Sequence, residues 1–389
     1  MTNTEKKKLV VTLTSYPRRT ENIHRVIDSI IDQTIKVDEI ILYLSILEFP
    51  QRELNLPNEL LSLLGKRAFK IEWVEENLKS HKKYYYVLKD REDAIVITVD
   101  DDTIYAKTMI YDLLKIHERY PSAVVARRVR IILKDGDSLA QYNQWDGQVE
   151  EYADVPRMDL CAIGVGGVLY PPGCASHEWF QMEKIKEYAE NQDDLWLKYN
   201  EIKNGIPVIY VKNSECDMDL AEDRNEESLS SLNMYGGAND ICIKKLFTEE
   251  ELGDISKEWF AELLQQEEYI LKKKQFYSYK MRSVFNDSEN EPFYLFGAGR
   301  RAVKIMKMLS DFELIERIKC ILVSDRMNNP LVLEGVQVCS INEVQLVPKA
   351  KVLCGVSDIY ADEIAMLLKQ YDCEMIWLDL DAILRFYTF

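Results

Sequence analysis

The sequence predicts an α/β protein with two domains, the first built on a mixed, mostly parallel sheet and the second a smaller α/β domain. Short apolar runs alternate with amphipathic segments early in the chain, and continuously apolar strands separated by helices are typical of parallel sheets covered on both faces. The alternation restarts after a polar segment, 286–291, and the length of 389 residues exceeds one ordinary domain. We therefore expect domains over 1–285 and 290–389.

The elements of the first domain follow from periodicity. In the segment 19–33, five apolar side chains recur at helical spacing on one face, which predicts an amphipathic helix. Apolar runs predict strands, and the remaining periodic segments predict helices. The expected strands are 8–15, 38–45, 69–76, 94–100 and 123–133, and the expected helices are 19–33, 58–65, 80–90, 106–120, a helix followed by a strand in 192–211, and 256–283.

The second domain repeats the pattern on a smaller scale. Apolar runs that end in glycine or aspartate alternate with helical segments, so a second parallel sheet is expected. The expected strands are 292–299, 318–325, 350–357 and 374–379, and the expected helices are 300–312 and 361–371.

Composition excludes several classes of protein. The net charge of −17 argues against broad binding of nucleic acids or anionic membranes, which requires a basic surface. The eight cysteines include no CxxC spacing, so a zinc knuckle or redox dithiol is not expected, and free thiols fit a reducing cytoplasm. No segment has the features of a signal peptide or a membrane-spanning helix. An acidic chain that handles an anion needs local positive charge or a metal ion.

Three consecutive carboxylates, Asp100–Asp102, follow the apolar run 95–99. In an extended chain Asp100 and Asp102 would share one side, and at the carboxyl end of a parallel strand they would project into the crevice where such sheets bind ligands. A hard divalent cation between them would relieve their repulsion and could bridge to a diphosphate. Alternatively, Asp102 or Thr103 caps the helix that follows and the other acids are solvated.

Five motifs occur in a fixed order: "VVTLTSYPRR", "KKYYYVLKD", "IVITVDDDTIY", "GVGGVLYPPG" and "DDLW". Together they resemble a bacterial GT-A-fold glycosyltransferase of the kind that builds capsular or cell-surface polysaccharides, over roughly residues 8–250. The resemblance implies a nucleotide-sugar donor, with UDP as the expected carrier, a glycan or lipid-linked acceptor, and a cytoplasmic protein located peripherally at the inner face of the membrane.

The resemblance also implies roles for the aspartates. Asp100 and Asp102 would hold Mn²⁺ or Mg²⁺ on the donor diphosphate, and Asp101 would contact the sugar. Asp194, with Asp193 beside it, would take the proton of the acceptor hydroxyl. The alternative for this pair is a favourable charge at a helix start. Asp240 is a candidate for the remaining metal ligand; the favoured alternative is a glycine turn with Asn239 capping the next helix.

Further donor contacts are expected from two loops and a lysine. The loop after the first strand would lie against the nucleotide, unless Pro17 and its arginines only form the turn into the next helix. Lys83 would lie near the donor phosphates, unless it is a solvated surface lysine, as most lysines are. A glycine-rich loop would approach the donor, unless it is a strand bulge with a tight turn. The candidates are Thr14, Ser15, Tyr16, Arg18, Lys83, Gly166 and Gly167.

A second glycine motif, G-x-G-x-x-A from Gly297, lies between an expected strand and helix in the second domain. This placement is required for a Rossmann-like dinucleotide fingerprint, and the next strand ends at Asp325. Gly297, Gly299, Arg300 and Asp325 are therefore candidates for a second nucleotide site. A purely structural domain is the alternative, since no oxidoreductase catalytic set accompanies the motif.

The sequence allows two other functions. The chain would be an NAD-dependent sugar-modifying oxidoreductase if the second domain carried the chemistry. It would be a non-catalytic nucleotide-sugar-binding protein if both domains only bind. Neither the oligomeric state nor the stereochemical outcome of transfer follows from the sequence.

Overall fold

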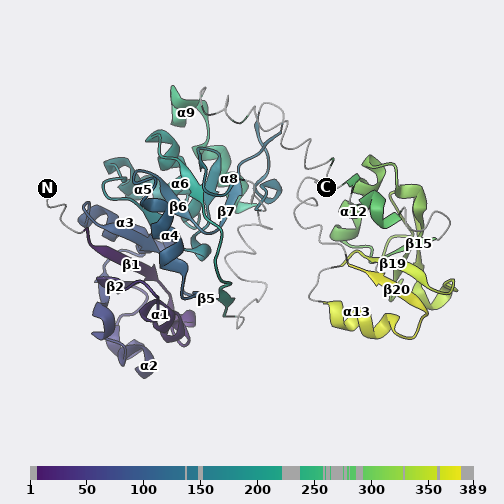
Figure 1. Ribbon diagram of the computed structural model, residues 1–389, viewed down its shortest axis with the longest axis horizontal. Helices are drawn as coiled ribbons and strands as arrows, with labels where there is room; N and C mark the ends of the chain where they lie inside the picture. The colour runs from purple at the N-terminus through teal and green to yellow at the C-terminus, as the bar shows by residue number, and fades with distance from the viewer. Residues whose placement is uncertain are drawn as a thin grey trace. The chain divides into compact units, whose positions relative to one another are not determined.

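The chain forms two compact units, Met1–Leu264 and Gln265–Phe389, each an α/β structure (Figure 1). This division falls earlier than the expected boundary at 285–290, because Met281 and Phe285 belong to the hydrophobic core of the second unit. The polar segment 286–291 lies outside the described residues. The computed structural model describes residues 7–135, 138–147, 152–220, 237–256, 259, 263, 275, 278–279, 281–285, 292–326, 329–356 and 360–377.

The first unit is built on an eight-stranded sheet, with the order β10-β13-β6-β12-β4-β1-β2-β3. The four strands β4-β1-β2-β3 are parallel, and β12 lies antiparallel between β4 and β6, so the expected mixed, mostly parallel sheet is confirmed. The strands are β1 (Leu9–Thr14), β2 (Glu39–Ser45), β3 (Phe69–Val74), β4 (Ile95–Thr98), β6 (Val124–Ala126), β10 (Pro156–Arg157), β12 (Val168–Tyr170) and β13 (Val208–Tyr210).

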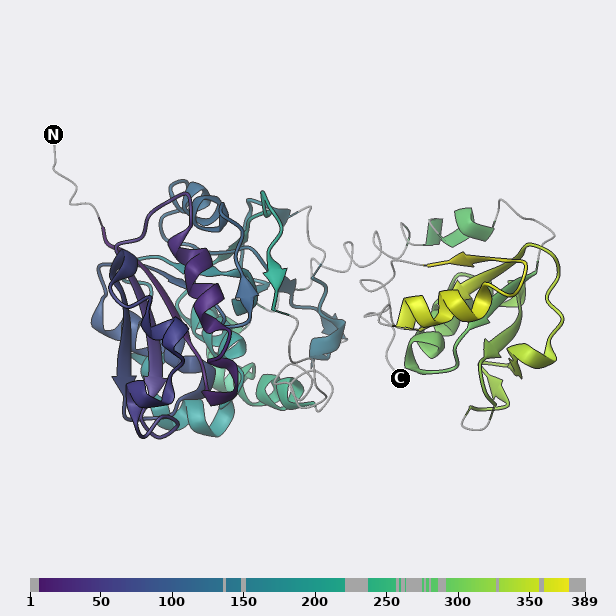
Figure 2. The ribbon, with the colours of Figure 1, turned by 90° about the horizontal axis from the view of Figure 1, so that it is seen from below.

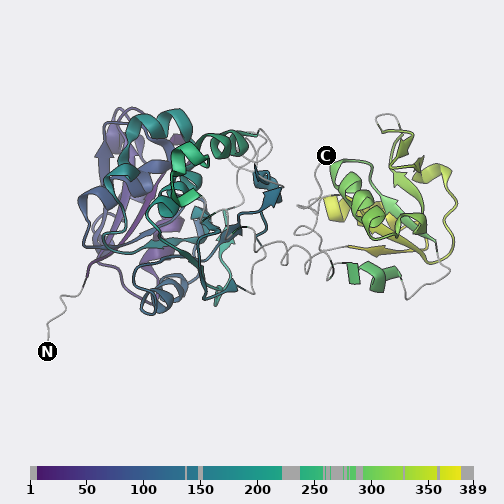
Figure 3. The same ribbon diagram turned by 90° about the horizontal axis from the view of Figure 1, so that it is seen from above.

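Helices cover both faces of this sheet (Figures 2 and 3). Apolar side chains of α1, α2 and α4 form one hydrophobic core with the strands β1, β2 and β4. Helix α3 packs on β1, β2 and β4, and α6 packs on a short strand, β11 (Leu160–Ala162). The helices are α1 (Ile23–Ile31), α2 (Asn58–Leu61), α3 (Lys82–Asp90), α4 (Met109–His117), α5 (Met182–Tyr188), α6 (Asp193–Lys203), α8 (Ala238–Leu246) and α9 (Glu249–Leu252).

Some elements differ from the expectation. The expected strand 123–133 is two short strands, β6 and β7 (Val129–Ile131), because the chain bends at Arg127 and Arg128 and then pairs with β11 in a separate sheet. The expected strand 94–100 ends at Thr98. Most of the expected helix 256–283 lies outside the described residues. Among the helices that the structure describes, none combines the length and apolarity needed to cross a bilayer.

The second unit has a six-stranded sheet with the order β17-β18-β16-β15-β19-β20. All neighbours are parallel except the edge strand β17 (Val332–Leu333), so the expected second parallel sheet is confirmed. The chain order reverses between β15 and β19, which is a topological switch point. The other elements are β15 (Phe293–Phe296), α12 (Arg300–Asp311), β16 (Ile318–Val323), β18 (Val336–Ser340), β19 (Ala350–Cys354), α13 (Ala361–Leu368) and β20 (Cys373–Ile376).

Candidate functional site

The three consecutive carboxylates lie in a turn at the carboxyl end of β4. Asp101 and Asp102 form the turn before a two-residue strand, β5 (Thr103–Ile104). One guanidinium nitrogen of Arg19, Nη1, lies 2.8 Å from Asp101 Oδ1 and 2.8 Å from Asp102 Oδ2. Asp100 instead contacts Lys83. The expected alternation, with Asp100 and Asp102 on one side, does not describe these contacts because the backbone turns after Thr98 instead of continuing as a strand.

Lys83 joins the carboxylate turn to the start of α6. Its side chain is 5% exposed, and Nζ lies 2.6 Å from Asp100 Oδ1 and 2.8 Å from Asp193 Oδ2. Burial alone would lower the pKa of Lys83, but the charges of Asp100, Asp193 and Asp194 raise it well above the usual value. The ammonium is therefore charged, and it is a buried group of the acidic cluster. The solvated surface lysine that the sequence favoured is not what the structure shows.

The two acids at the start of α6 have different environments. Asp193 accepts a hydrogen bond from Ser80 Oγ at 2.8 Å; burial opposes its charge, but Lys83 and His81 lower the pKa of its carboxyl below the usual value. Asp194 Oδ1 accepts the backbone N–H of Gly164 at 3.1 Å. Burial and then the neighbouring Asp193 charge raise the pKa of Asp194 well above its usual range. Two adjacent carboxyls whose pKa values are moved apart can take separate roles in proton transfer.

Gly164 closes the cluster from the glycine-rich loop. A Cβ at this position would lie 2.6 Å from Lys83 Nζ, 3.2 Å from Asp100 Oδ1 and 3.3 Å from Asp194 Oδ1. A side chain here would force the Lys83 ammonium to shift away from its ion pairs, so a glycine suits this position. The glycine-rich loop was predicted from the sequence, but Gly166 and Gly167 were the candidates. The spacing of the glycines does not indicate that Gly164 is the one that contacts the cluster.

The two glycines selected from the sequence have packing contacts of their own. A Cβ on Gly166 would lie 2.6 Å from Arg128 Cβ. Gly167 has a φ of +84°, a conformation that favours glycine, and it adjoins Met109. Close packing at Gly166 and the backbone conformation of Gly167 account for a glycine at each position. Their expected role as donor contacts stays a prediction.

The loop after β1 supplies direct contacts to the carboxylate turn. Ser15 Oγ donates to Asp101 Oδ2 at 2.6 Å, whereas Thr14 Oγ1 donates to the carbonyl of Tyr43 on β2 at 2.8 Å. The guanidinium of Arg19 lies 5.7 Å from the ring centroid of Tyr16. These residues join β1 to the turn that follows β4.

Arg19, which the sequence analysis did not select, is the arginine that contacts the carboxylates. Burial alone would lower its pKa, but the charges of Asp101 and Asp102 raise it above the usual value. Arg18, which was selected, is exposed. The two arginines are adjacent in a 3₁₀ turn, Pro17–Arg19, so no periodic signal in the sequence indicates which of them faces inward.

The oxygen ligands of the turn suit a hard divalent cation. Mg²⁺ is usually held by one or two carboxylates together with substrate phosphates and water, so two carboxylates would be enough on the protein side. The role of Asp100 and Asp102 as metal ligands stays a prediction. Burial raises the pKa of Asp100; the Lys83 charge opposes this and the Asp102 charge adds to it, so these two carboxylates interact. Within the described residues, no group of three or more His, Cys, Asp or Glu side chains is gathered around one point.

Asp240, the candidate for a further metal ligand, has a structural contact. It lies in the first turn of α8, and its Oδ1 accepts the backbone N–H of Tyr142 at 2.7 Å. This contact joins α8 to the 3₁₀ turn Tyr142–Gln144, and it accounts for a carboxylate at this position without a metal. Its participation in metal binding stays a prediction.

The glycine motif of the second unit lies at the switch point of the second sheet. Gly297, directly after β15, has a φ of +105°, and a Cβ there would lie 2.6 Å from Val356 Cγ1 and 3.1 Å from the carbonyl oxygen of Gly355. Gly299 precedes α12, and an added Cβ would meet nothing within 4 Å. Asp325 is exposed beyond β16. The side chain of Arg300 lies outside the described part of the helix.

A separate groove of about 810 Å³ lies over β2, β3 and α3 of the first unit. It is lined by aromatic and charged side chains, including Tyr43, Tyr86, Glu72 and Arg91. Asp100, Asp102, Lys83 and the α6 acids are not among its lining residues. The groove is therefore distinct from the acidic cluster.

Comparison with known proteins yields structural similarities and no sequence match. No protein-family model matches the chain, and no curated protein matches it. A mannosyltransferase from Pyrobaculum calidifontis, solved with GDP-mannose and Mn²⁺, is 14% identical, with a TM-score of 0.38 over 68% of this chain and 76% of its own. TarS residues 1–349 from S. aureus, solved with UDP-GlcNAc, is 16% identical, with a TM-score of 0.37 over 80% of this chain and 84% of its own.

A further structure of TarS 1–349 gives the same TM-score of 0.37 at 15% identity, over 80% of this chain and 83% of its own. Similarity at this level assigns neither a family nor a substrate to the chain.

Proposed function

We propose that the first unit is a metal-dependent glycosyltransferase that moves a sugar from a nucleotide-sugar, with UDP as the expected carrier, to a glycan or lipid-linked acceptor of a surface polysaccharide. One observation carries the proposal. Asp100, Lys83 and Asp194 converge on Gly164 at the carboxyl ends of parallel strands, where α/β sheets bind ligands. The cluster combines oxygen ligands for a cation, a fixed positive charge and a carboxyl with a raised pKa.

Asp100 and Asp102 would hold Mn²⁺ or Mg²⁺. The ion, when bound, would neutralise the charge of the departing diphosphate. The residues of this chain contribute further positive charge close by, since Lys83 contacts Asp100 and Arg19 contacts Asp102. With a cation held by the carboxylates, the Lys83 and Arg19 side chains would be available to contact the phosphates. Thr14, Ser15, Tyr16, Arg18, Asp101, Gly166 and Gly167 are proposed as the donor side of the site.

Asp194 would act as the general base. In the transfer step the acceptor hydroxyl oxygen forms a bond to the anomeric carbon, the bond to the diphosphate oxygen breaks, and the hydroxyl proton moves to the Asp194 carboxylate. A raised pKa suits this role, because it makes the carboxylate a stronger base. Asp193 stays ionised beside Lys83 and Ser80 and keeps the pKa of its neighbour high.

A thermal-shift panel tests the proposal. Ligands that bind the folded state raise the melting temperature by mass action. We expect nucleotide-sugars to stabilise the full chain when Mn²⁺ is present and to lose this effect when a chelator removes the metal. The variant Asp102→Asn is the control that should abolish the metal-dependent part. The proposal fails if no nucleotide-sugar gives a Mn²⁺-dependent shift.

The second unit is proposed to bind a nucleotide at its switch point, where Gly297 and Gly355 adjoin. Gly299, Arg300 and Asp325 are the other candidates for this site. If NAD or a free nucleotide raises the melting temperature equally in the wild-type protein and in Asp102→Asn, the result would support this second site. Turnover of NAD with a sugar would instead support an oxidoreductase.

A further inference from the structure

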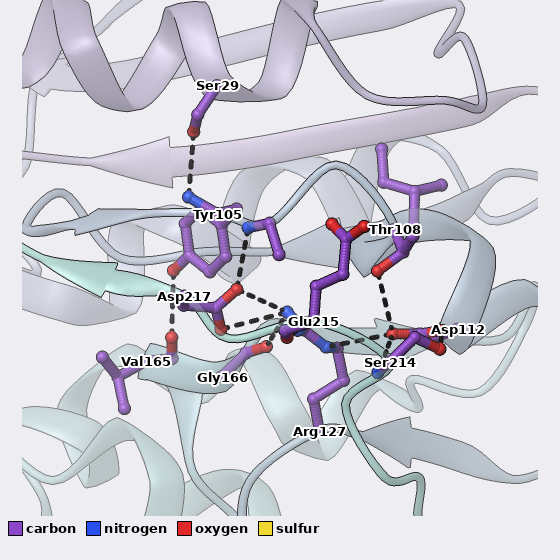
Figure 4. A network of polar contacts seen from close by, with 12 residues as sticks. Ser29, Tyr105, Thr108, Asp112, Arg127, Val165, Gly166, Ser214, Glu215 and Asp217 are labelled. Atoms are coloured by element: carbon purple, nitrogen blue, oxygen red, sulfur yellow. Dashed lines mark hydrogen bonds and ion pairs between the residues drawn. The ribbon is translucent and has the colours of Figure 1, made fainter.

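A buried polar network adjoins the carboxylate turn, and Arg127 is its centre (Figure 4). Arg127 follows β6, and its side chain is 0% exposed. Its Nη1 donates to both carboxylate oxygens of Asp217, at 3.0 and 3.1 Å, and its Nη2 donates to the carbonyl of Glu215 at 3.2 Å. Nε lies 3.8 Å from Oδ2 of Asp112, which is 3% exposed. A planar guanidinium can serve several acceptors in fixed directions at once, which an ammonium cannot.

The network holds the segment 214–217 in place. Asp112, on α4, accepts the backbone N–H of Ser214 at 3.0 Å and its hydroxyl at 2.5 Å. Arg127 holds the next residues through Glu215 and Asp217. These contacts attach a stretch of loop to the body of the first unit immediately before a short strand, β14 (Met218–Asp219).

Strand β14 in turn contacts the carboxylate turn. It pairs antiparallel with β5, and the N–H of Leu220 donates to the carbonyl of Asp102 at 2.8 Å. The carboxylate of Asp217 also accepts the N–H of Ala106 at 2.9 Å. A ladder of two residues per strand is too short to be stable by itself. The position of the Asp102 backbone therefore depends on the side chains that anchor both ends of this pairing.

The same network reaches Asp100 through Tyr105. The hydroxyl of Tyr105 accepts the N–H of Asp100 at 2.9 Å and donates to the carbonyl of Val165 at 3.2 Å. The backbone N–H of Tyr105 donates to Ser29 Oγ at 3.1 Å. Tyr105 directly precedes Ala106, whose N–H is accepted by Asp217, so the bonds that position the Asp100 backbone adjoin the network, whereas Asp102 is contacted through Leu220 beside β14.

We propose that Arg127, with Asp112 and Asp217, is a positioning centre for the cation-binding carboxylates, acting on Asp102 through β14. The inference rests on the proposed function, because it concerns the same site. An apolar cluster would stabilise these elements as well as buried ion pairs do, but it could not fix the direction of backbone groups. The three charged side chains supply directional bonds to Glu215, Ser214 and Ala106.

The test uses Asp217→Asn in the full chain. This change keeps the size of the side chain but removes the charge that Arg127 contacts. We expect faster hydrogen exchange at the amides of Leu220 and Ala106 in the metal-free protein. We also expect the Mn²⁺-dependent affinity for UDP, measured by calorimetry, to fall about 10- to 100-fold, as is typical when residues behind metal ligands are changed. The control is Asp154→Asn, which removes an exposed Arg119–Asp154 pair of the same unit.

A milder variant guards against loss of the fold. Ser214→Ala removes one hydroxyl bond to Asp112 and leaves the ion pairs intact, and it should also speed exchange at Leu220. Unchanged exchange at Leu220 in both folded variants overturns the positioning centre, whatever the ligand. Faster exchange with unchanged Mn²⁺–UDP affinity overturns its role at the cation. If the wild-type chain binds no nucleotide-sugar in the presence of Mn²⁺, the proposed function fails instead. Hydrogen exchange in the metal-free variants still tests the network in that case.

Discussion

Removal of the Lys83 charge is expected to destabilise the first unit strongly. In Lys83→Met, the carboxylates of Asp100 and Asp193 lose an ammonium that lies 2.6 Å and 2.8 Å away, respectively. All three side chains are largely buried: Lys83 is 5% exposed, Asp100 30% and Asp193 11%. Breaking a buried pair by removing one partner costs about 3–5 kcal/mol. For a unit of this size, that corresponds to a melting temperature roughly 6–20 °C lower.

The deficit should shrink in acid. In the wild-type protein the pKa of Asp193 is lowered by Lys83, so the stability from this pair is present above the unfolded pKa and is lost as pH falls through the folded pKa. In the variant the same carboxyls are buried without a partner and take up protons readily. The difference between variant and wild type should therefore be larger at pH 7 than at pH 4, and it should shrink further as pH falls below the usual aspartate pKa.

Lys82→Met is the matched control for this experiment. Lys82 is also buried on α3, at 2% exposure, but it pairs with Glu48, which is outside the acidic cluster. Thermal unfolding at both pH values, together with calorimetric binding of Mn²⁺ and UDP, separates the two lysines. We expect only Lys83→Met to alter ligand binding. An unchanged melting temperature in Lys83→Met, or a deficit equal at pH 7 and pH 4, would refute the reasoning.

Three further variants test the site. Gly164→Ala should lower turnover sharply, because its Cβ would lie 2.6 Å from Lys83 Nζ; Gly299→Ala, where the added Cβ meets nothing within 4 Å, should not. Asp194→Asn should leave donor binding intact and reduce turnover about 10²- to 10⁴-fold; an equal loss of donor binding would indicate a different role for Asp194. The turnover rate of the wild-type protein should fall as pH drops through the raised pKa of Asp194. Asp102→Asn should abolish Mn²⁺-dependent binding of UDP, and unchanged calorimetric affinity would count against the metal site.

The strands and helices followed from apolar periodicity because burial is their main driving force. The runs over 9–14, 39–45 and 318–323 form strands within a residue or two of their expected ends. The expected strand 123–133 is wrong because a buried arginine ends it: the Arg127 side chain is directed into a network that no local pattern records. Short strands such as β14 depend on partners far away in the sequence, so periodicity could not predict them.

At the site, the sequence by itself determined the chemistry that is available: consecutive carboxylates after an apolar strand, an acidic pair at a helix start, and a glycine-rich loop between them. The tertiary structure decided which groups meet. It selected Arg19 over Arg18, buried Lys83 between Asp100 and Asp193, and placed Gly164 against both. The physical reason is that local periodicity is set by which face of an element is buried. The contacts of a charged side chain depend on turns and on pairings between segments distant in the chain.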